Sequence, residues 1–383
     1  MKIAHTVANI DEEASGPYYS VPSLVAALNR RGHDAEVVTV SSKELTFALG
    51  APVQSFEADE VFPSVLKRLG RSRQMDRYIK ASDADIFHAH GLWMMSNIYP
   101  ARKVAGSETP LVLAPRGMLG RDALKFSKPV KNLFGLLYQN RALQAVSCFH
   151  ATAQSELEDI RAFGLKQPVA IVPNGIDLPT LDNRPAKPDG QLPYILSLGR
   201  VHPKKALDRL ISAFASVADE FAHWRLRIIG PSEGGYAQRL EAQAKELGLS
   251  DRVSIEKPVF GAAKIALMQQ AEIFALSTLH ENFAMTVAES LAVETPVIST
   301  KGAPWSGLES HGCGWWTDHG IEPMASALRK AMALSNDQRQ AMGAKGREWM
   351  NREFGWAGIA AKMEQVYQWL LKDGQKPDFV HLG

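Results

Sequence analysis

STLHENFAMTVAESLAVETPVIST, residues 277–300, is the stretch that decides the fold class. The apolar run at 271–276 just before it predicts a buried strand, and Pro296–Thr300 predicts the next one. Between them, one apolar helix face is predicted by the spacing of Phe283, Val287, Ala288, Leu291 and Ala292. A unit of strand, loop, helix and strand is typical of a parallel α/β sheet.

Two glutamates flank the start of this helix, Glu281 just before it and Glu289 inside it. Eight residues of helix rise about 12 Å, roughly the length of a sugar-diphosphate-ribose skeleton. A helix N-terminus between the two carboxylates favours an anionic phosphate, and each carboxylate can accept hydrogen bonds from paired hydroxyls. From these residues alone, a solvated acidic helix start explains the pair equally well.

The segment 281–289, ENFAMTVAE, followed by TPVI at 295–298, resembles the Glu-x7-Glu signature of family 4 retaining glycosyltransferases. The resemblance implies that Glu289 holds the donor ribose and that the transferred sugar contacts Glu281 and the residues after it, Asn282, Phe283, Ala284 and Met285. Two departures stand out: Ala284 replaces a usual Gly, and Val293-Glu294 replaces a usual Ala-Gly. We expect the Ala284 methyl group to narrow or redirect the choice of donor.

A phosphate site is predicted in the same half of the chain, where strand Tyr194–Leu198 is followed by Gly199-Arg200 and Lys205. A strand end leading into a helix is the place where phosphate binds most readily. The pattern resembles the family's Gly-Arg-x4-Lys, which implies that Arg200 and Lys205 grip the donor pyrophosphate without a divalent metal.

The remaining donor residues follow two later strands. Gly230, after the strand at 226–229, is expected to let the nucleotide approach the backbone closely. Val259 ends a segment that resembles the family's base-binding loop. Lys257 replaces a usual Gly in that loop, which leaves the base open.

The chain begins with a Rossmann-like pattern: a strand at 1–8, a helix at 21–32 and a strand at 35–40. No Gly-x-Gly-x-x-Gly follows the first strand, which argues against a nicotinamide cofactor. The loop 9–17 contains only Gly16. The resemblance favours a place for Gly16 near the donor phosphates or the acceptor, and the alternative is a simple turn of the chain.

The next informative motif is DADIFHAHGLW, residues 83–93. Asp83 and Asp85 precede a strand, whereas a metal-binding acidic pair in a parallel sheet is expected after one. We expect His88 and His90 to point to opposite sides of the strand end, so that at most one faces a substrate. The resemblance implies that His90 lies near the reacting sugar, and a packed histidine is the alternative.

Two further residues are assigned to the acceptor. Arg116 follows the strand at 111–114 and is placed to contact an acceptor phosphate with two hydrogen bonds, although a surface arginine fits nearly as well. Asn174 lies in the segment VPNGID, 172–177, which resembles the family's turn at the interdomain cleft.

Charge is uneven although the formal net charge is only +2. Residues 66–141 contain fourteen lysines and arginines against five acidic residues. This balance suits a lipid-linked diphosphate sugar or an anionic membrane leaflet, with solvated helix faces as the alternative. Nucleic acid is not expected, because no aromatic interleaving accompanies the charge. The stretch 122–143 fits either an interfacial amphipathic helix or an ordinary packed one.

Location follows from what the sequence lacks. The N-terminus reads as a strand and not as a secretory signal, and no apolar run approaches the length of a membrane span. Cys148 and Cys313 have no metal-ligand spacing, so we expect structural thiols in a reducing compartment. The predicted location is cytoplasmic, with peripheral contact at the inner face of the membrane.

Together these features predict an α/β protein of the GT-B fold, with two Rossmann-like, doubly wound parallel-sheet domains facing a cleft. We expect an acceptor-binding domain at 1–178, a linker at 179–192, a donor-binding domain at 193–353, and a C-terminal helix, 354–383, returning to the first domain. The expected reaction is retaining transfer of a hexosyl group from a nucleoside-diphosphate sugar to a saccharide or lipid-linked saccharide, with no cofactor and no metal. The resemblance is to bacterial exopolysaccharide and lipopolysaccharide enzymes. The alternatives are a sugar-nucleotide epimerase and a two-lobed sugar-binding protein without chemistry.

Overall fold

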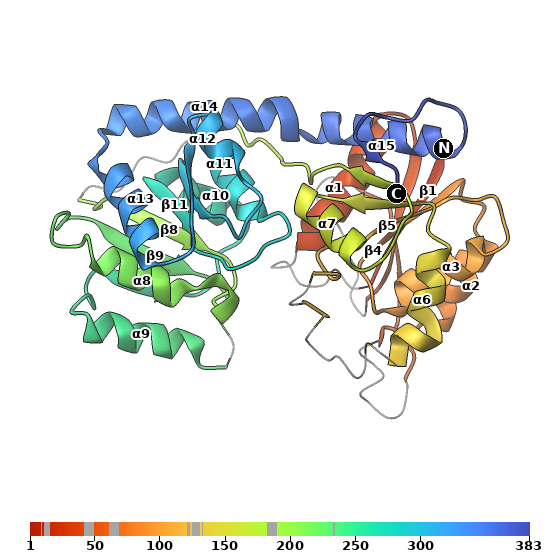
Figure 1. Ribbon diagram of the computed structural model, residues 1–383, viewed down its shortest axis with the longest axis horizontal. Helices are drawn as coiled ribbons and strands as arrows, with labels where there is room; N and C mark the ends of the chain where they lie inside the picture. Colours follow the sequence, from red (N-terminus) through yellow and green to blue (C-terminus); the bar gives the residue numbers. More distant parts are fainter. Residues whose placement is uncertain are drawn as a thin grey trace. The chain divides into compact units, whose positions relative to one another are not determined.

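The computed structural model describes residues 1–8, 10, 16–41, 50–60, 69–120, 123–124, 131, 133–181, 190–232 and 234–383. The chain forms two compact units (Figure 1). Unit 1 contains Met1–Gly175 and Trp356–Gly383, and unit 2 contains Ile176–Gly355. These divisions lie close to those expected near 178 and 354. Most of the expected linker, residues 182–189, falls outside the described part of the chain.

Unit 1 is built on an eight-stranded sheet in the order β14-β7-β6-β5-β4-β1-β2-β3. Neighbouring strands are parallel except for β14, which pairs antiparallel with β7. The strand order reverses between β1 and β4, the place where doubly wound sheets bind ligands. The strands are β1 (Lys2–Val7), β2 (Asp34–Val40), β3 (Val53–Phe56), β4 (Ile86–His90), β5 (Leu111–Ala114), β6 (Cys148–Ala151), β7 (Val169–Ile171) and β14 (Val380–His381).

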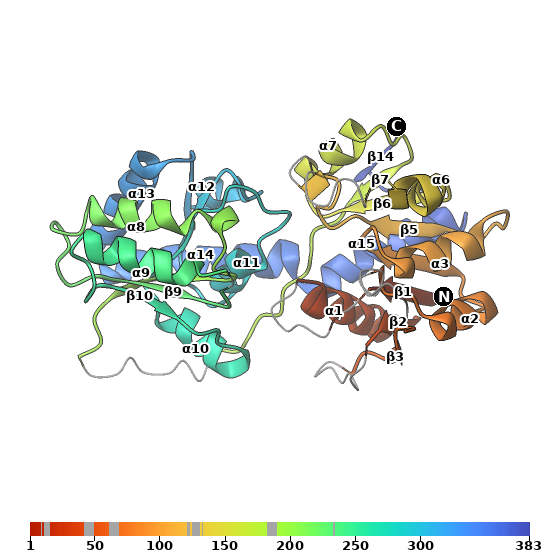
Figure 2. The ribbon, with the colours of Figure 1, turned by 90° about the horizontal axis from the view of Figure 1, so that it is seen from below.

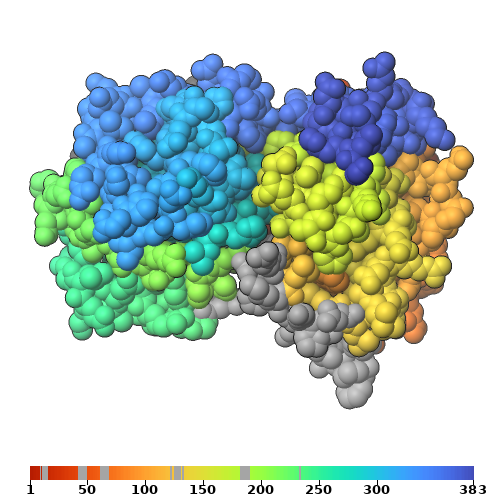
Figure 3. Space-filling model, in the orientation of Figure 1, coloured from red at the N-terminus to blue at the C-terminus, as the bar shows by residue number. Residues whose placement is uncertain are grey.

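Helices cover both faces of this sheet. One apolar cluster joins the sheet to α1 (Gly16–Arg30) and α15 (Trp356–Leu370). The opposite cluster is covered by α2 (Arg73–Ala81), α3 (Met95–Val104), α6 (Asn140–Gln144) and α7 (Gln154–Ala162). Accordingly, α1 and α2 lie on opposite sides of β1 and β2 (Figure 2). The last residues of the chain, dark blue in Figure 3, lie against the yellow-green segment that ends in β7.

Unit 2 repeats this logic with six parallel strands in the order β10-β9-β8-β11-β12-β13. The order reverses between β8 and β11. The strands are β8 (Tyr194–Leu198), β9 (Arg225–Ile229), β10 (Val253–Glu256), β11 (Ile273–Leu276), β12 (Val297–Thr300) and β13 (Gly314–Thr317). One face carries α8 (Leu207–Ala215), α9 (Tyr236–Glu246) and α13 (Ile321–Ala333); the other carries α10 (Gly261–Gln270), α11 (Met285–Ala292), α12 (Gly307–Ser310) and α14 (Asn336–Phe354).

The strand, helix and strand predicted from residues 271–300 are confirmed as β11, α11 and β12. The helix begins only at Met285, four residues after Glu281. The estimate of about 12 Å between the two glutamates treated all of 281–289 as helical, and this premise is wrong for residues 281–284.

Two expectations concern the membrane: a helix in the stretch 122–143 and the lack of a membrane-spanning segment. Of the stretch 122–143, the described residues include a π-helical turn at Gly135–Gln139 and the start of α6, while 122, 125–130 and 132 lie outside the described part. Within the described ranges, none of the helices combines the length and apolar character that a membrane crossing requires.

Both cysteines are buried, and burial raises the pKa of each thiol to about 12, as expected for structural thiols.

Candidate active site

In unit 2, the loops after β8 and β11 lie together because these strands are neighbours at the reversal of strand order. Backbone and side-chain hydrogen bonds join the two loops: the Leu279 amide donates to the Lys204 carbonyl at 2.9 Å, and the Ser277 hydroxyl donates to the Lys205 carbonyl at 2.7 Å. The Glu281 amide donates to the Gly302 carbonyl at 2.6 Å, which adds the loop after β12. Three loops therefore fix the position of Glu281.

Lys205 and Glu281 form an ion pair, with 2.7 Å between Nζ and Oε1. The Thr278 hydroxyl donates to the same carboxylate oxygen at 3.2 Å. Burial alone would raise the pKa of Glu281, but the charge and hydrogen bond of Lys205, helped by Lys204 and Thr278, outweigh it and lower the pKa. Glu281 is therefore a carboxylate near pH 7. Arg200, predicted to share the phosphate with Lys205, is exposed in the same loop.

Glu289 is also held by a lysine, which the sequence did not single out. Lys264 of α10 donates to Glu289 Oε1 at 2.7 Å, and both side chains are largely buried. The second carboxylate oxygen, Oε2, is buried and has no hydrogen-bond partner among the described residues. Such an acceptor costs free energy unless a ligand supplies a donor. A ribose hydroxyl would do so.

The backbone just before α11 shows why glycine suits position 284, where this chain has alanine. Ala284 precedes the helix with φ of 63° and ψ of 71°, a left-handed conformation that favours glycine. Glu294, just after the helix, has φ of 66°. Both positions are therefore ones where glycine would be less strained. Lys257, the third replacement, is not among the non-glycine residues with positive φ.

The structure shows the packing of the other predicted donor residues but not their contacts with a donor. A Cβ atom on Gly230 would lie 1.8 Å from the Gly199 carbonyl oxygen, so glycine is required here by the backbone itself. The Phe283 side chain packs on Trp305, whose indole donates to the Phe283 carbonyl at 2.5 Å. Val259 is half-buried against the same core. The predicted donor contacts of these residues, and of Asn282 and Met285, stay predictions.

In unit 1, His90 lies at the end of β4 and is 2% exposed. Arg116 donates to His90 Nδ1 at 3.0 Å, and His5 Nδ1 lies 3.0 Å from His90 Nε2. Because arginine can only donate, His90 Nδ1 accepts, and its Nε2–H donates to His5. The remaining nitrogen of His5 is buried without a partner in the described part of the chain.

A second chain of hydrogen bonds runs beside the first. His150 Nε2 donates to the Val172 carbonyl at 2.8 Å, so its Nδ1 accepts from His88 Nε2 at 3.2 Å. His88 Nδ1 in turn accepts from the Tyr367 hydroxyl at 2.8 Å. Burial is the main cause that lowers the pKa of all four histidines, to about 3 for His5 and His150. The cluster is therefore neutral near pH 7.

The expectation that His88 and His90 point to opposite sides of β4 is wrong. Their ring centroids lie 4.2 Å apart, because residues two apart in a strand share a face. One nitrogen each of His5, His88 and His90 fall within 4.8 Å of one another, near enough for a single metal ion. The half-buried guanidinium of Arg116, 3.0 Å from His90, opposes a further cation there.

Arg116 joins His90 to Asn174, to whose side-chain oxygen it donates at 2.6 Å. Arg116 has φ of 58° and is predicted to bind an acceptor phosphate, but two of its terminal nitrogens are already bonded within unit 1. His90 is likewise bonded at both nitrogens. Substrate contacts by His90, Arg116 or Asn174 would have to replace these bonds. Burial lowers the pKa of Arg116 to about 10, so it stays charged.

Two other features of unit 1 were singled out from the sequence: the acidic pair Asp83 and Asp85, and Gly16, whose place near the donor or the acceptor stays a prediction. Asp83 forms an ion pair with Lys2, and Asp85 accepts from the Lys2 amide at 2.7 Å, at the starting ends of the strands. Gly16 is the exposed first residue of α1, while residues 9 and 11–15 of the loop before it lie outside the described part.

Two glycosyltransferase family models match successive parts of the chain. The model of "Glycosyl transferases group 1" matches residues 180–349, and that of "Glycosyl transferase 4-like domain" matches 15–175. D-inositol 3-phosphate glycosyltransferase of Xylanimonas cellulosilytica is 28% identical over 247 residues, 60% of this chain and 58% of that protein. The chain thus spans little more than half of that curated relative.

Solved structures share the whole architecture. Sucrose-phosphate synthase from Thermosynechococcus elongatus superposes with a TM-score of 0.76 at 18% identity, covering 97% of this chain and 99% of that one. Anabaena HepE in complex with UDP and glucose gives 0.72 at 18% identity, covering 96% and 99%. With its two Rossmann-like units and both family models matched in order, this chain belongs to the family 4 (group 1) glycosyltransferases and has the GT-B fold.

Proposed function

We propose that this protein transfers a hexosyl group from a nucleoside-diphosphate sugar to an acceptor hydroxyl, with retention at the anomeric carbon. The observation that carries the proposal is the pair of lysine-bound glutamates on either side of the start of α11, Glu281 on Lys205 and Glu289 on Lys264. Family membership supplies the reaction class, and these four residues supply a place for each part of the donor.

The donor is placed by matching its groups to the charges of unit 2. Lys205 and Arg200 take the pyrophosphate, and the first amides of α11 add donors to the same anion. The pyrophosphate competes with Glu281 for Lys205, which frees Glu281 to accept from the sugar hydroxyls. The unpartnered Oε2 of Glu289 accepts from the ribose.

Chemistry then consists of one displacement at the anomeric carbon. The bond from that carbon to the diphosphate oxygen breaks while a bond to the acceptor oxygen forms on the same face. Lys205 and Arg200 neutralise the charge that develops on the leaving diphosphate. The acceptor proton passes to the departing phosphate oxygen, so that no enzyme nucleophile, metal or cofactor takes part.

The acceptor is assigned to unit 1 by the family resemblance. We infer a saccharide or lipid-linked saccharide, used in bacterial exopolysaccharide or lipopolysaccharide synthesis in the cytoplasm at the inner face of the membrane. His90, Arg116 and Asn174 would contact it after exchanging their present hydrogen bonds.

A thermal-shift panel of UDP, GDP, ADP and their hexose conjugates, each with and without EDTA, tests the donor site. UDP comes first because HepE was solved with it. A ligand at one hundred times its Kd adds about 2.7 kcal/mol of stability, so one nucleotide should raise Tm clearly and EDTA should not change the result. No response to any nucleotide would overturn the proposal.

A second measurement separates transfer from epimerisation, which needs no acceptor. Release of free nucleoside diphosphate from the matching sugar nucleotide is followed with and without an acceptor saccharide. Transfer predicts release that depends on the acceptor. Interconversion of the sugar without net release would point to an epimerase instead.

A further inference from the structure

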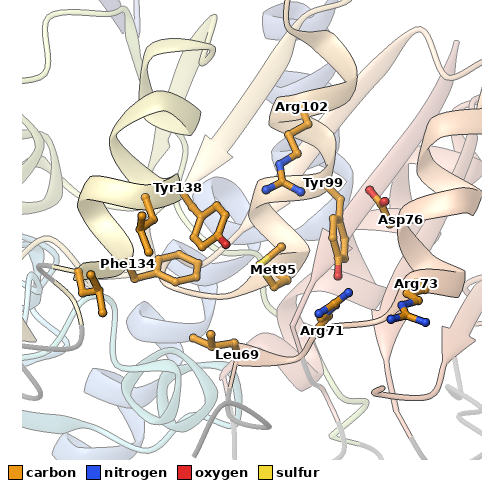
Figure 4. A pocket seen from close by; sticks show the side chains of 11 residues that line it. Leu69, Arg71, Arg73, Asp76, Met95, Tyr99, Arg102, Phe134 and Tyr138 are labelled. Atoms are coloured by element: carbon orange, nitrogen blue, oxygen red, sulfur yellow. The ribbon is translucent and has the colours of Figure 1, made fainter. Parts of the chain in front are cut away.

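A cavity of about 520 Å³ lies in unit 1 between α2, α3 and the segment 133–138, and its lining includes none of the four histidines. Its volume is within the range of small-molecule sites, about 300–1,000 Å³. Figure 4 shows Phe134 and Tyr138 beside Met95 on one side, and Arg71 and Arg73 on the other. The cavity therefore has an apolar half and a cationic half.

The apolar half is unusually open to solvent. Leu133 and Leu137, which line it, are 60% and 57% exposed, and Phe134 and Met95 form a buried floor. Exposed leucines over a buried apolar floor leave hydrocarbon surface in water. That costs free energy, which an apolar ligand would recover at about 25 cal/mol per Å².

The cationic half carries an excess of positive charge. Arg71 and Arg73 share Asp59, with 3.3 and 3.7 Å between nitrogen and oxygen. Asp76, the acidic residue of the lining, is paired with Lys80 at 2.6 Å. Within the described part of the chain, Asp59 therefore neutralises one of the two charges of Arg71 and Arg73 and leaves the other.

Among the residues that the structure describes, Arg102 adds a second uncompensated charge. Its guanidinium lies 5.3 Å from the centre of the Tyr138 ring and forms no ion pair with any described residue. It stands where the apolar and cationic halves of the cavity meet (Figure 4). Two spare positive charges match a phosphate monoester, which carries about −1.5 to −2 at pH 7, and arginine suits phosphate geometry.

We propose that this cavity binds a lipid phosphate: a phosphate group held by Arg71, Arg73 and Arg102, with the hydrocarbon chain against Leu137, Phe134 and Met95. All residues of the site belong to unit 1, and the proposal does not depend on the transfer reaction. The further step, that the bound lipid carries the acceptor saccharide, rests on the proposed function.

The test is isothermal titration calorimetry on the full chain with dodecyl phosphate below its critical micelle concentration. Inorganic phosphate, dodecyl maltoside and an acidic peptide are the comparison ligands. We expect saturable binding of one dodecyl phosphate and at least tenfold weaker binding of the other three. Equal binding of inorganic phosphate, of the neutral detergent or of the peptide would each overturn the lipid-phosphate assignment.

Matched variants place the ligand. Arg102→Gln and Leu137→Ser should each weaken binding of dodecyl phosphate about tenfold. Arg141→Gln and Leu136→Ser are the controls, because both residues are exposed nearby but do not line the cavity. Equal losses in the controls, or no loss in the first pair, would overturn the site.

The donor site provides an independent readout. If dodecyl phosphate fails to bind while a nucleoside diphosphate still raises Tm, only this inference is wrong. If dodecyl phosphate binds and no nucleotide does, the transferase proposal is wrong and the lipid site stands.

Discussion

Both candidate regions lie where a sheet reverses its strand order, yet they hold their polar groups in opposite ways. Unit 1 buries four neutral histidines in hydrogen-bonded chains. Unit 2 holds two carboxylates on lysines, Glu281 on Lys205 and Glu289 on Lys264. Neutral donors and acceptors suit uncharged hydroxyls, whereas paired charges can separate around a pyrophosphate. The contrast fits an acceptor in one unit and a donor in the other.

The largest expected effect is that acid destabilises unit 1 at a higher pH than unit 2. Its four histidines have folded pKa values lowered by burial, to about 3 for His5 and His150. The unfolded chain therefore binds more protons between pH 6.5 and 3, and stability falls as pH drops through that window. Each histidine contributes up to about 1.4 kcal/mol per pH unit. The lowered pKa of Glu281 destabilises unit 2 only below about pH 4.5.

The chain offers one thiol probe for each unit, because Cys148 lies in unit 1 and Cys313 in unit 2. Urea titrations at several pH values, pulsed with a thiol reagent that reacts in acid, should show Cys148 exposed at lower urea as pH falls from 6.5 to 5. Cys313 should shift little. His150→Gln should flatten the Cys148 response, with the exposed His223 of unit 2 changed to Gln as control. Parallel shifts at both cysteines would remove the contrast.

Breaking the ion pair of unit 2 comes next. Lys205→Ala should cost about 3 kcal/mol of transition-state stabilisation, as losing one oriented donor does, because it takes the charge from both Glu281 and the leaving diphosphate. Steady-state kcat with donor and acceptor measures the loss. Lys245→Ala, which removes an exposed lysine of α9 in the same unit, is the matched control. An unchanged kcat in Lys205→Ala would show that Lys205 does not stabilise the leaving diphosphate.

A substitution of Glu289 is expected to have a smaller effect, on binding of the donor nucleotide. Glu289→Gln keeps the shape but removes the charge that pairs with Lys264, and it weakens the acceptor at the unpartnered oxygen. We expect about tenfold weaker binding of the nucleoside diphosphate, measured by calorimetry. Adenine, guanine or uracil as free base should be unaffected. Retained affinity for the diphosphate would exclude the ribose role.

Relief of backbone strain should have the smallest effect on stability, and its sign should differ between the two units. Ala284 of unit 2 and Arg116 of unit 1 both have positive φ. Ala284→Gly should stabilise the protein by up to about 1 kcal/mol, because glycine relieves a left-handed conformation. Lys257→Gly should instead lower stability, since Lys257 has no positive φ to relieve. Arg116→Gly should also destabilise, because its bonds to His90 and Asn174 are lost.

Sequence reasoning worked best where a pattern is local. The apolar spacing within 271–300 predicted β11, α11 and β12, and the charged residues around them were found by motif. It also marked Ala284 and Glu294 as unusual, and the structure adds the reason, a positive φ at both.

Contacts between distant segments were not predictable in this way. His5, His150 and Tyr367 come from β1, β6 and α15, and no spacing rule links them to His88 or His90. Lys264 sits in a helix whose pattern gives no sign of Glu289. The cavity beside α3 likewise depends on tertiary packing, because its lining comes from three separate segments.

Unit 1 is assembled from both ends of the chain, and this sets an order of events during synthesis. When a ribosome has made residues up to Gly355, unit 2 is complete, whereas unit 1 still lacks α15 and β14. The hydroxyl of Tyr367 has not yet reached His88, and the apolar cluster that α15 shares with α1 is still incomplete. Unit 2 can therefore fold first, although unit 1 begins the sequence. The hydrogen bonds of the histidine cluster are completed only after α15 has left the ribosome.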